Sequence, residues 1–107
     1  MEVKVLGTVY NLQEVPKTDD TVLENNDGYC DTSVKKVVVD EMKEKKPGMK
    51  ESLLYYQQQV KRHEIIHAFL FESGLDTCCS WVCEEMVDWL SIQFPKMKSA
   101  FEEAGCL

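Results

Sequence analysis

The sequence predicts an α+β fold in which a small antiparallel β-sheet is followed by two long helices. Residues 3–12 and 29–39 are rich in β-branched and aromatic residues, which favour strands. Two later segments, residues 50–72 and 81–104, are longer and space their apolar residues as amphipathic helices do. At 107 residues the chain is long enough for one modest core, so we expect a single domain covering residues 1–107.

The strands are expected to form a single antiparallel pair. Residues 3–12 (VKVLGTVYNL) make the first strand, and Gly7 within it marks a bulge or bend. A polar loop with a short helical turn at residues 20–24 then ends in the turn sequence NDG at residues 26–28. The second strand follows this turn, with an interruption at residues 31–32.

The first long helix is preceded by a charged connection, residues 40–48, which ends in Pro-Gly and should be exposed. We expect this helix to begin near Lys50, with Ser52 or a neighbour of Lys50 as its N-cap. It should end at about Glu72, because Gly74 is well suited to follow a helix C-terminus.

The last helix is expected over residues 81–104, after a connection at residues 75–80. Pro95 lies inside this segment and should kink or divide the helix, because proline has no N–H to donate. Aromatic residues recur along both helices and are most simply assigned to the core. They are Phe69, Phe71, Trp81, Trp89, Phe94 and Phe101.

The net charge of −7 disfavours a nucleic-acid surface, because phosphate binding depends on clustered Lys and Arg. The only basic cluster is interleaved with glutamates and is interpreted as a solvated linker. It comprises Lys43, Lys45, Lys46 and Lys50. No apolar run is suited to a membrane span, so no membrane partner is expected.

The chain is expected to be cytoplasmic, because its N-terminus lacks the basic start and apolar block of a signal peptide. Five cysteines are an odd number, and without an export signal we expect reduced thiols rather than a disulfide framework. We expect a monomer, or a homodimer formed through the apolar faces of the helices.

The most informative stretch is residues 60–72 (VKRHEIIHAFLFE), because it places an H-E-x-x-H pattern on the first long helix. His63 and His67 are four residues apart, so both imidazoles lie on one face and can reach one metal ion. Zinc suits two imidazoles at about 2.0–2.1 Å, and Glu64 could act as general base toward a water in an open position. The alternative is two histidines at a core boundary without a metal, because their face continues the apolar stripe of the helix. That stripe comprises Leu53, Tyr56, Val60 and Leu70.

A third ligand is expected from the last helix, where Glu84 and Glu85 precede Asp88. The H-E-x-x-H helix followed by E-x-x-x-D resembles the gluzincin branch of the zincin metallopeptidases. The resemblance implies that Glu84 is the third zinc ligand and that Asp88 orients a ligand histidine. Glu85 is the competitor, but only Glu84 has an Asp four residues later on the same face.

The small size and the two-helix motif also resemble the compact zincin-like proteins of phages and prophages, including the ImmA/IrrE type. This resemblance covers about residues 60–95 and implies one Zn²⁺ and a peptide or protein substrate. The chain departs from many larger peptidases, which use a further downstream histidine to stabilise the oxyanion. Tyr29, Tyr55 and Tyr56 are the candidate substitutes.

The main rival to an open catalytic site is a closed structural zinc site. Cys78, Cys79 and Cys83 lie close in sequence to Glu84 and could join the two histidines through their thiolates. The commoner role of such cysteines is to pack as small hydrophobic residues.

The expected function is zinc-dependent peptide-bond hydrolysis with Glu64 as general base. The alternative is a zinc-stabilised interaction module without catalysis, such as a phage-encoded regulator, and a weaker one is a metal-free helical adaptor. Trp81 and Trp89 lie near the predicted site in sequence and could also line a substrate cleft.

Overall fold

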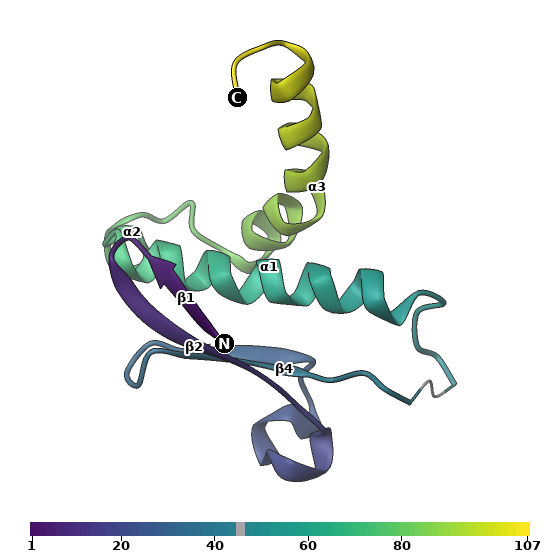
Figure 1. Cartoon of the computed structure of the whole chain (residues 1–107). Helices are drawn as coiled ribbons and strands as arrows, with labels where there is room; N and C mark the ends of the chain where they lie inside the picture. The colour runs from purple at the N-terminus through teal and green to yellow at the C-terminus, as the bar shows by residue number, and fades with distance from the viewer. Residues whose placement is uncertain (45–46) are drawn as a thin grey trace.

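The computed structural model describes residues 1–44 and 47–107 and has an α+β architecture with one four-stranded sheet. The long helix α1 (Leu53–Glu72) lies across one face of the sheet, and a second long helix, α3 (Glu84–Glu103), lies on the far side of α1 (Figure 1). The first turns of α3 contact α1, whereas its C-terminal part extends away from the rest of the molecule. Among the described residues, no helix has the length and apolar character needed to cross a bilayer.

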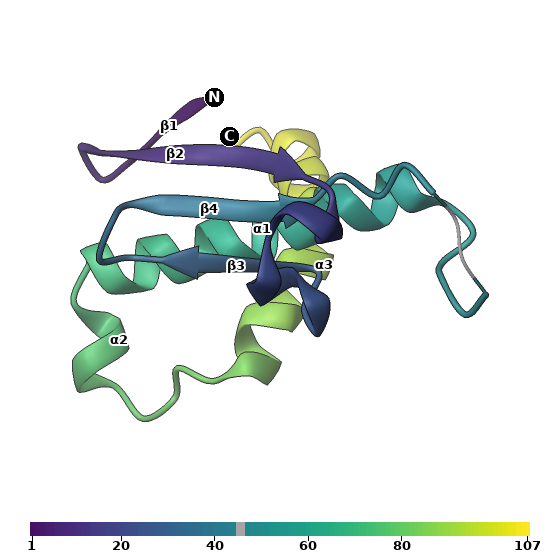
Figure 2. The same ribbon diagram turned by 90° about the horizontal axis from the view of Figure 1, so that it is seen from below.

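The sheet is mixed, with strand order β1-β2-β4-β3. Strands β1 (Glu2–Val5) and β2 (Thr8–Val15) form an antiparallel hairpin, and β3 (Gly28–Asp31) pairs antiparallel with β4 (Lys36–Asp40). The central pair, β2 and β4, is parallel, with Asn11 opposite Lys36 and Val15 opposite Asp40. Figure 2 shows the strands side by side, with β3 at the edge of the sheet.

The expected single antiparallel pair is therefore wrong, because each predicted strand contains a hairpin. Leu6 and Gly7 have φ values of 49° and 87°, which suit a tight two-residue turn, so the first segment folds back on itself. In the second segment the chain turns after Asp31, and Lys35 has a φ of 55° just before β4 begins. The connection after β2 contains two short 3₁₀ helices, Lys17–Asp19 and Thr21–Glu24, and the second confirms the helical turn expected at residues 20–24.

The main core lies between the sheet and α1. Val37 and Val39 of β4 point into it with Tyr10 and Leu12 of β2 and Val60 of α1. Val38 is equally buried but lies outside this cluster, because successive strand residues point to opposite faces. Figure 1 shows the 3₁₀ segment on that opposite side of the sheet, where it contributes the fully buried Leu23.

Helix α1 is joined to the sheet by polar contacts at both of its ends. Near its start, Gln57 donates from Nε2 to the carbonyl of Asp40 at 3.0 Å. At its end, Glu72 accepts hydrogen bonds from the Tyr10 hydroxyl at 2.8 Å and from Lys35 Nζ at 2.7 Å.

The prediction that residues 40–48 are exposed is wrong at Asp40 and Met42, which are buried. Lys45 and Lys46 of the predicted linker lie outside the described residues.

The predicted caps of α1 are confirmed. The Ser52 side chain accepts a hydrogen bond from the Tyr55 amide at 3.3 Å, and the helix begins at Leu53 rather than near Lys50. Ser73 caps the C-terminus, and Gly74 follows in the left-handed region with a φ of 83°.

The last helix differs from the prediction in two ways. The connection contains a short helix, α2 (Leu75–Cys78), and α3 begins at Glu84 instead of Trp81. Pro95 does not divide α3, which is continuous from Glu84 to Glu103.

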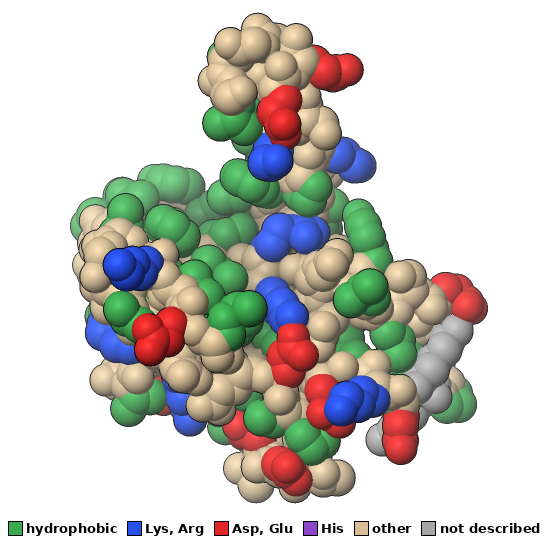
Figure 3. Space-filling model, in the orientation of Figure 1, with side chains coloured by type: hydrophobic (Ala, Val, Ile, Leu, Met, Phe, Trp, Pro, Cys, Tyr) green, Lys and Arg blue, Asp and Glu red, His purple; other side chains and the backbone are tan. Residues whose placement is uncertain are grey.

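The assignment of the aromatic residues to the core is also wrong. The six predicted residues are between 37% and 57% exposed, with Trp81 and Trp89 the most open. They share the two-helix half of the molecule, and hydrophobic side chains cover much of its surface near the base of α3 (Figure 3). Only Val87 and Ser91 of α3 are buried, because this helix touches α1 along a short length instead of packing into a larger core.

Gly28 is required at the start of β3 because the strand approaches α1 closely there. A Cβ added at Gly28 would lie 2.8 Å from Val60 Cγ1 and 3.2 Å from the carbonyl oxygen of Val38. We predict that Gly28→Ala lowers the free energy of unfolding by about 1–3 kcal/mol, as overpacking does. Urea denaturation measures this, and the loss should be smaller in a Val60→Ala background, where the clashing methyl is absent. An equal loss in both backgrounds would contradict the steric explanation.

The Glu72 contacts predict a pH-dependent contribution to stability. Its hydrogen bonds from Lys35 and Tyr10 hold the pKa of this carboxyl below its ordinary value of 4.5. A lowered pKa means that the stabilisation is present above the pKa of the unfolded chain and is lost as the pH falls through the folded value. Glu72→Gln should therefore be less stable than the unmodified protein at pH 7, and the difference should shrink below about pH 4. Denaturation at both pH values tests this, with Glu103→Gln at an exposed position of α3 as the matched control.

Candidate metal centre

His63 and His67 lie one turn apart on α1 and bring their imidazoles together. Their Nε2 atoms are 3.2 Å apart, and the ring centroids are 4.9 Å apart. Both rings are partly buried, with side-chain exposures of 15% and 26%. The two imidazoles meet because the helical repeat places residues i and i+4 on the same face.

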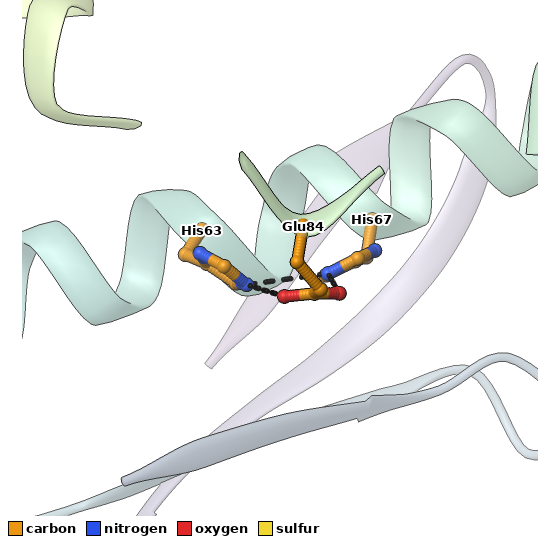
Figure 4. A group of neighbouring side chains, drawn as sticks. All are labelled: His63, His67 and Glu84. Carbon is orange, nitrogen blue, oxygen red and sulfur yellow. Dashed lines mark hydrogen bonds and ion pairs between the residues drawn. The ribbon is translucent and has the colours of Figure 1, made fainter. Parts of the chain in front are cut away.

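Glu84 completes a three-residue group because α3 begins there, beside the two histidines. Its Oε2 lies 3.0 Å from His63 Nε2, and its Oε1 lies 2.9 Å from His67 Nε2. Figure 4 shows the carboxylate facing both rings. Within the described part of the chain, this is the one group of three or more His, Cys, Asp or Glu residues with ligand atoms close enough to hold a metal ion. Glu85, the alternative third ligand, is not part of it.

The geometry and donor chemistry of this group suit zinc. Ligand atoms about 2.0–2.1 Å from a tetrahedral ion lie about 3.3 Å from one another, close to the 3.2 Å between the two Nε2 atoms. Two imidazoles and one carboxylate also leave a fourth position open, as catalytic zinc sites do.

Asp88 lies one turn after Glu84 and contacts the other nitrogen of the first histidine. Its Oδ1 is 2.7 Å from His63 Nδ1. A proton on Nδ1 donates to this carboxylate, which leaves the lone pair of Nε2 directed at Glu84 and His67. In this tautomer the lone pair of His63 Nε2 is available to a cation held between the two rings and Glu84.

Glu64 is the buried acid of the centre, with a side chain that is 11% exposed. Its Oε1 is 3.8 Å from His63 Nε2. Burial raises the pKa of Glu64 to about 7, His63 opposes the rise, and the charges of Glu84 and Asp88 add to it. A carboxyl with such a pKa can exchange a proton near neutral pH.

A cleft runs beside the centre, between the first turns of α3 and the edge strand β3. Glu64, His63 and Glu84 line it together with Gly28. Its other lining residues come from β3 and the residues on either side of it, and from α1, α2 and α3. They include Asn26, Asp27, Tyr29, Cys30, Thr32, Tyr56, His67, Asp76 and Asp88.

The tyrosines proposed as oxyanion stabilisers are not arranged for that role. Tyr29 and Tyr56 line the cleft, but their hydroxyls donate at 2.6 Å to Asp20 and Asp27. Burial, followed by these hydrogen bonds, raises the pKa of both phenols to about 12. Tyr55 is 56% exposed and does not line the cleft.

The cysteines do not join the histidines in the described structure. Cys78 and Cys79 contact each other, with their sulfurs 3.5 Å apart, and Cys83 is exposed just before α3. Cys30 lines the cleft, but its sulfur is not among the ligand atoms that come together in the described structure. The donor set therefore consists of nitrogen and oxygen atoms.

One contact near the centre lies outside the sequence prediction. Arg62, next to the first histidine, donates from Nε to the carbonyl oxygen of Ser91 in α3 at 2.7 Å. In the sequence, Pro95 indicates that the Ser91 carbonyl needs another partner, because a proline inside a helix leaves the carbonyl four residues earlier without its usual donor.

No protein-family model matches the chain, and no curated protein or solved structure matches it either.

Proposed function

We propose that the protein is a zinc-dependent peptidase in which His63, His67 and Glu84 hold one Zn²⁺. The observation that carries the proposal is the convergence of these three side chains beside a buried acid, Glu64. Two imidazoles and one carboxylate are a ligand set that catalytic zinc sites use. An adjacent carboxyl can then serve as the general base of metal-assisted hydrolysis.

The chemistry that zinc supplies in such a site is polarisation of a substrate carbonyl and acidification of water toward a pKa of ~7. Glu64 takes the proton of the attacking water as general base and returns it to the leaving amine as general acid. Burial raises the pKa of Glu64 in the metal-free protein, and a bound cation would lower it, which favours the carboxylate that accepts the first proton.

Asp88 serves the same reaction through His63. By accepting from Nδ1 at 2.7 Å, it holds the imidazole with Nε2 directed into the centre and increases the basicity of that nitrogen. Asp88 thus acts on the reaction by orienting a ligand.

The substrate is best accommodated as an extended peptide along β3. This strand is at the edge of the sheet, so one side of its backbone is not paired within the sheet. The cleft that contains Glu64 and Glu84 borders the same strand. A peptide added to this edge through backbone hydrogen bonds would pass beside the centre, as in other cases of strand addition.

A second candidate function is a zinc-stabilised interaction module without catalysis. It is favoured by the exposed aromatic residues of the helical half, since exposed apolar patches often mark protein-binding surfaces. Trp89 and Phe94 on α3 are 57% and 48% exposed. The two candidates share the metal centre and differ in whether Glu64 performs acid–base chemistry.

Glu64→Gln should retain zinc but lower peptide hydrolysis by about 10²–10⁴-fold, because the amide cannot accept the proton of water. Zinc content and mass-spectrometric cleavage of a peptide library measure the two properties. Glu85→Gln is the matched control and should keep both. Hydrolysis at the unmodified rate in Glu64→Gln would contradict the mechanism, and zinc binding without hydrolysis by the unmodified protein would favour the interaction module.

Glu84→Ala should weaken zinc binding by at least ~100-fold, because it removes a direct ligand. Glu85→Ala should leave the affinity unchanged. Competition with a chelating dye gives the affinities, and the cobalt-substituted protein should show nitrogen and oxygen ligation without intense sulfur-to-cobalt charge transfer. Strong charge transfer would instead identify cysteine ligands and a closed structural site.

A further inference from the structure

Three residues on one face of α3 connect it to α1. Glu84, Asp88 and Ser91 follow a helical spacing of four and then three residues, so they form one stripe along α3. The first two contact the histidines of the candidate centre, and the third contacts Arg62. Arg62 and His63 are neighbours in the sequence of α1, so adjacent residues hold two successive turns of α3.

The carbonyl of Ser91 is available to Arg62 because of Pro95. In an α-helix the N–H of residue 95 would donate to the carbonyl of residue 91, but proline has no N–H and its ring pushes that carbonyl aside. Ser91 is fully buried, so its carbonyl needs a partner from the protein. Arg62 Nε supplies one at 2.7 Å, in a charge-assisted hydrogen bond.

Few other contacts fix α3 at this place. Val87 and Ser91 are its only buried residues in the described structure, and Val87 is the only apolar one. Ser91 also donates from Oγ to the carbonyl of Asp88 at 2.9 Å, a contact within α3 that does not join it to α1. Met86 and Leu90 are half-buried beside them, and the Arg62 hydrogen bond adds a directional contact that can set the rotation of α3.

We propose that Arg62 is a positioning residue of the metal centre, which acts by holding the Ser91 carbonyl that Pro95 leaves free. The contact fixes the rotation and height of α3 on α1, and it thereby places Glu84 against both histidines and Asp88 against His63. This inference rests on the proposed zinc centre and is independent of whether the centre hydrolyses peptides.

The first test compares Arg62→Met with Lys61→Met. Lys61 is the adjacent residue and carries the same charge, but it contacts Glu14 on the sheet and not α3. Arg62→Met should weaken zinc binding by about 10–100-fold, the usual range for residues that orient ligands, and should alter the d–d absorption of the cobalt-substituted protein. Lys61→Met should change neither. Equal affinities and spectra for the two variants would overturn the proposal.

A double-mutant cycle with Glu84→Ala tests whether Arg62 acts through that ligand. If it does, Arg62→Met should weaken zinc binding much less when Glu84 is already absent. Full additivity of the two effects would overturn positioning of Glu84 by Arg62.

Pro95→Ala supplies a variant that should fold even if Arg62→Met does not, because alanine is favoured over proline inside a helix. The backbone N–H that this substitution restores would compete with Arg62 for the Ser91 carbonyl. We expect zinc binding to weaken several-fold while stability without metal stays equal or rises. Unchanged zinc affinity would overturn the role of the free carbonyl. Absence of zinc binding by the unmodified protein would overturn the centre itself, which separates that failure from failure of the positioning role.

Discussion

The contact between His63 and the first two turns of α3 is the interaction on which the candidate centre depends. One imidazole meets Glu84 through Nε2 at 3.0 Å and Asp88 through Nδ1 at 2.7 Å. Helix α1 can offer this ring at a fixed place because Gln57 near its start and Glu72 at its end join it to the sheet. The sheet and α1 thus form a frame, and α3 brings the remaining groups to it.

The charges around the candidate centre would favour a bound cation. Glu64, Glu84 and Asp88 gather around two imidazoles in a chain whose net charge is already −7. Burial and the two neighbouring carboxylates make ionisation of Glu64 costly, as its raised pKa shows. A divalent cation would offset this repulsion, and the fourth position would remain accessible from the cleft beside β3.

The sequence was sufficient for features that depend on local spacing. The i, i+4 relation places His63 and His67 together, and the same relation between Glu84 and Asp88 favours Glu84 over Glu85 as the residue that meets them. Features that depend on distant partners could not be predicted in this way. The parallel pairing of β2 with β4 is set by how the intervening chain crosses the sheet, and the exposure of Trp89 follows from how little of α3 meets α1. Pro95 illustrates the limit, because the carbonyl that it leaves without a helical partner accepts a hydrogen bond from Arg62 on another helix.

Helix α3 buries few residues against α1, and this affects how often the residues of the candidate centre are held together. A helix with one buried apolar side chain can detach locally at a lower free energy than the whole fold requires, and Glu84 and Asp88 would leave with it. Any ligand that needs both helices is then bound only by the docked population, so its apparent affinity equals the intrinsic affinity scaled by the docked fraction. By the same linkage, occupancy of the centre would draw α3 onto α1, and the order of this helix would follow the free concentration of the ligand.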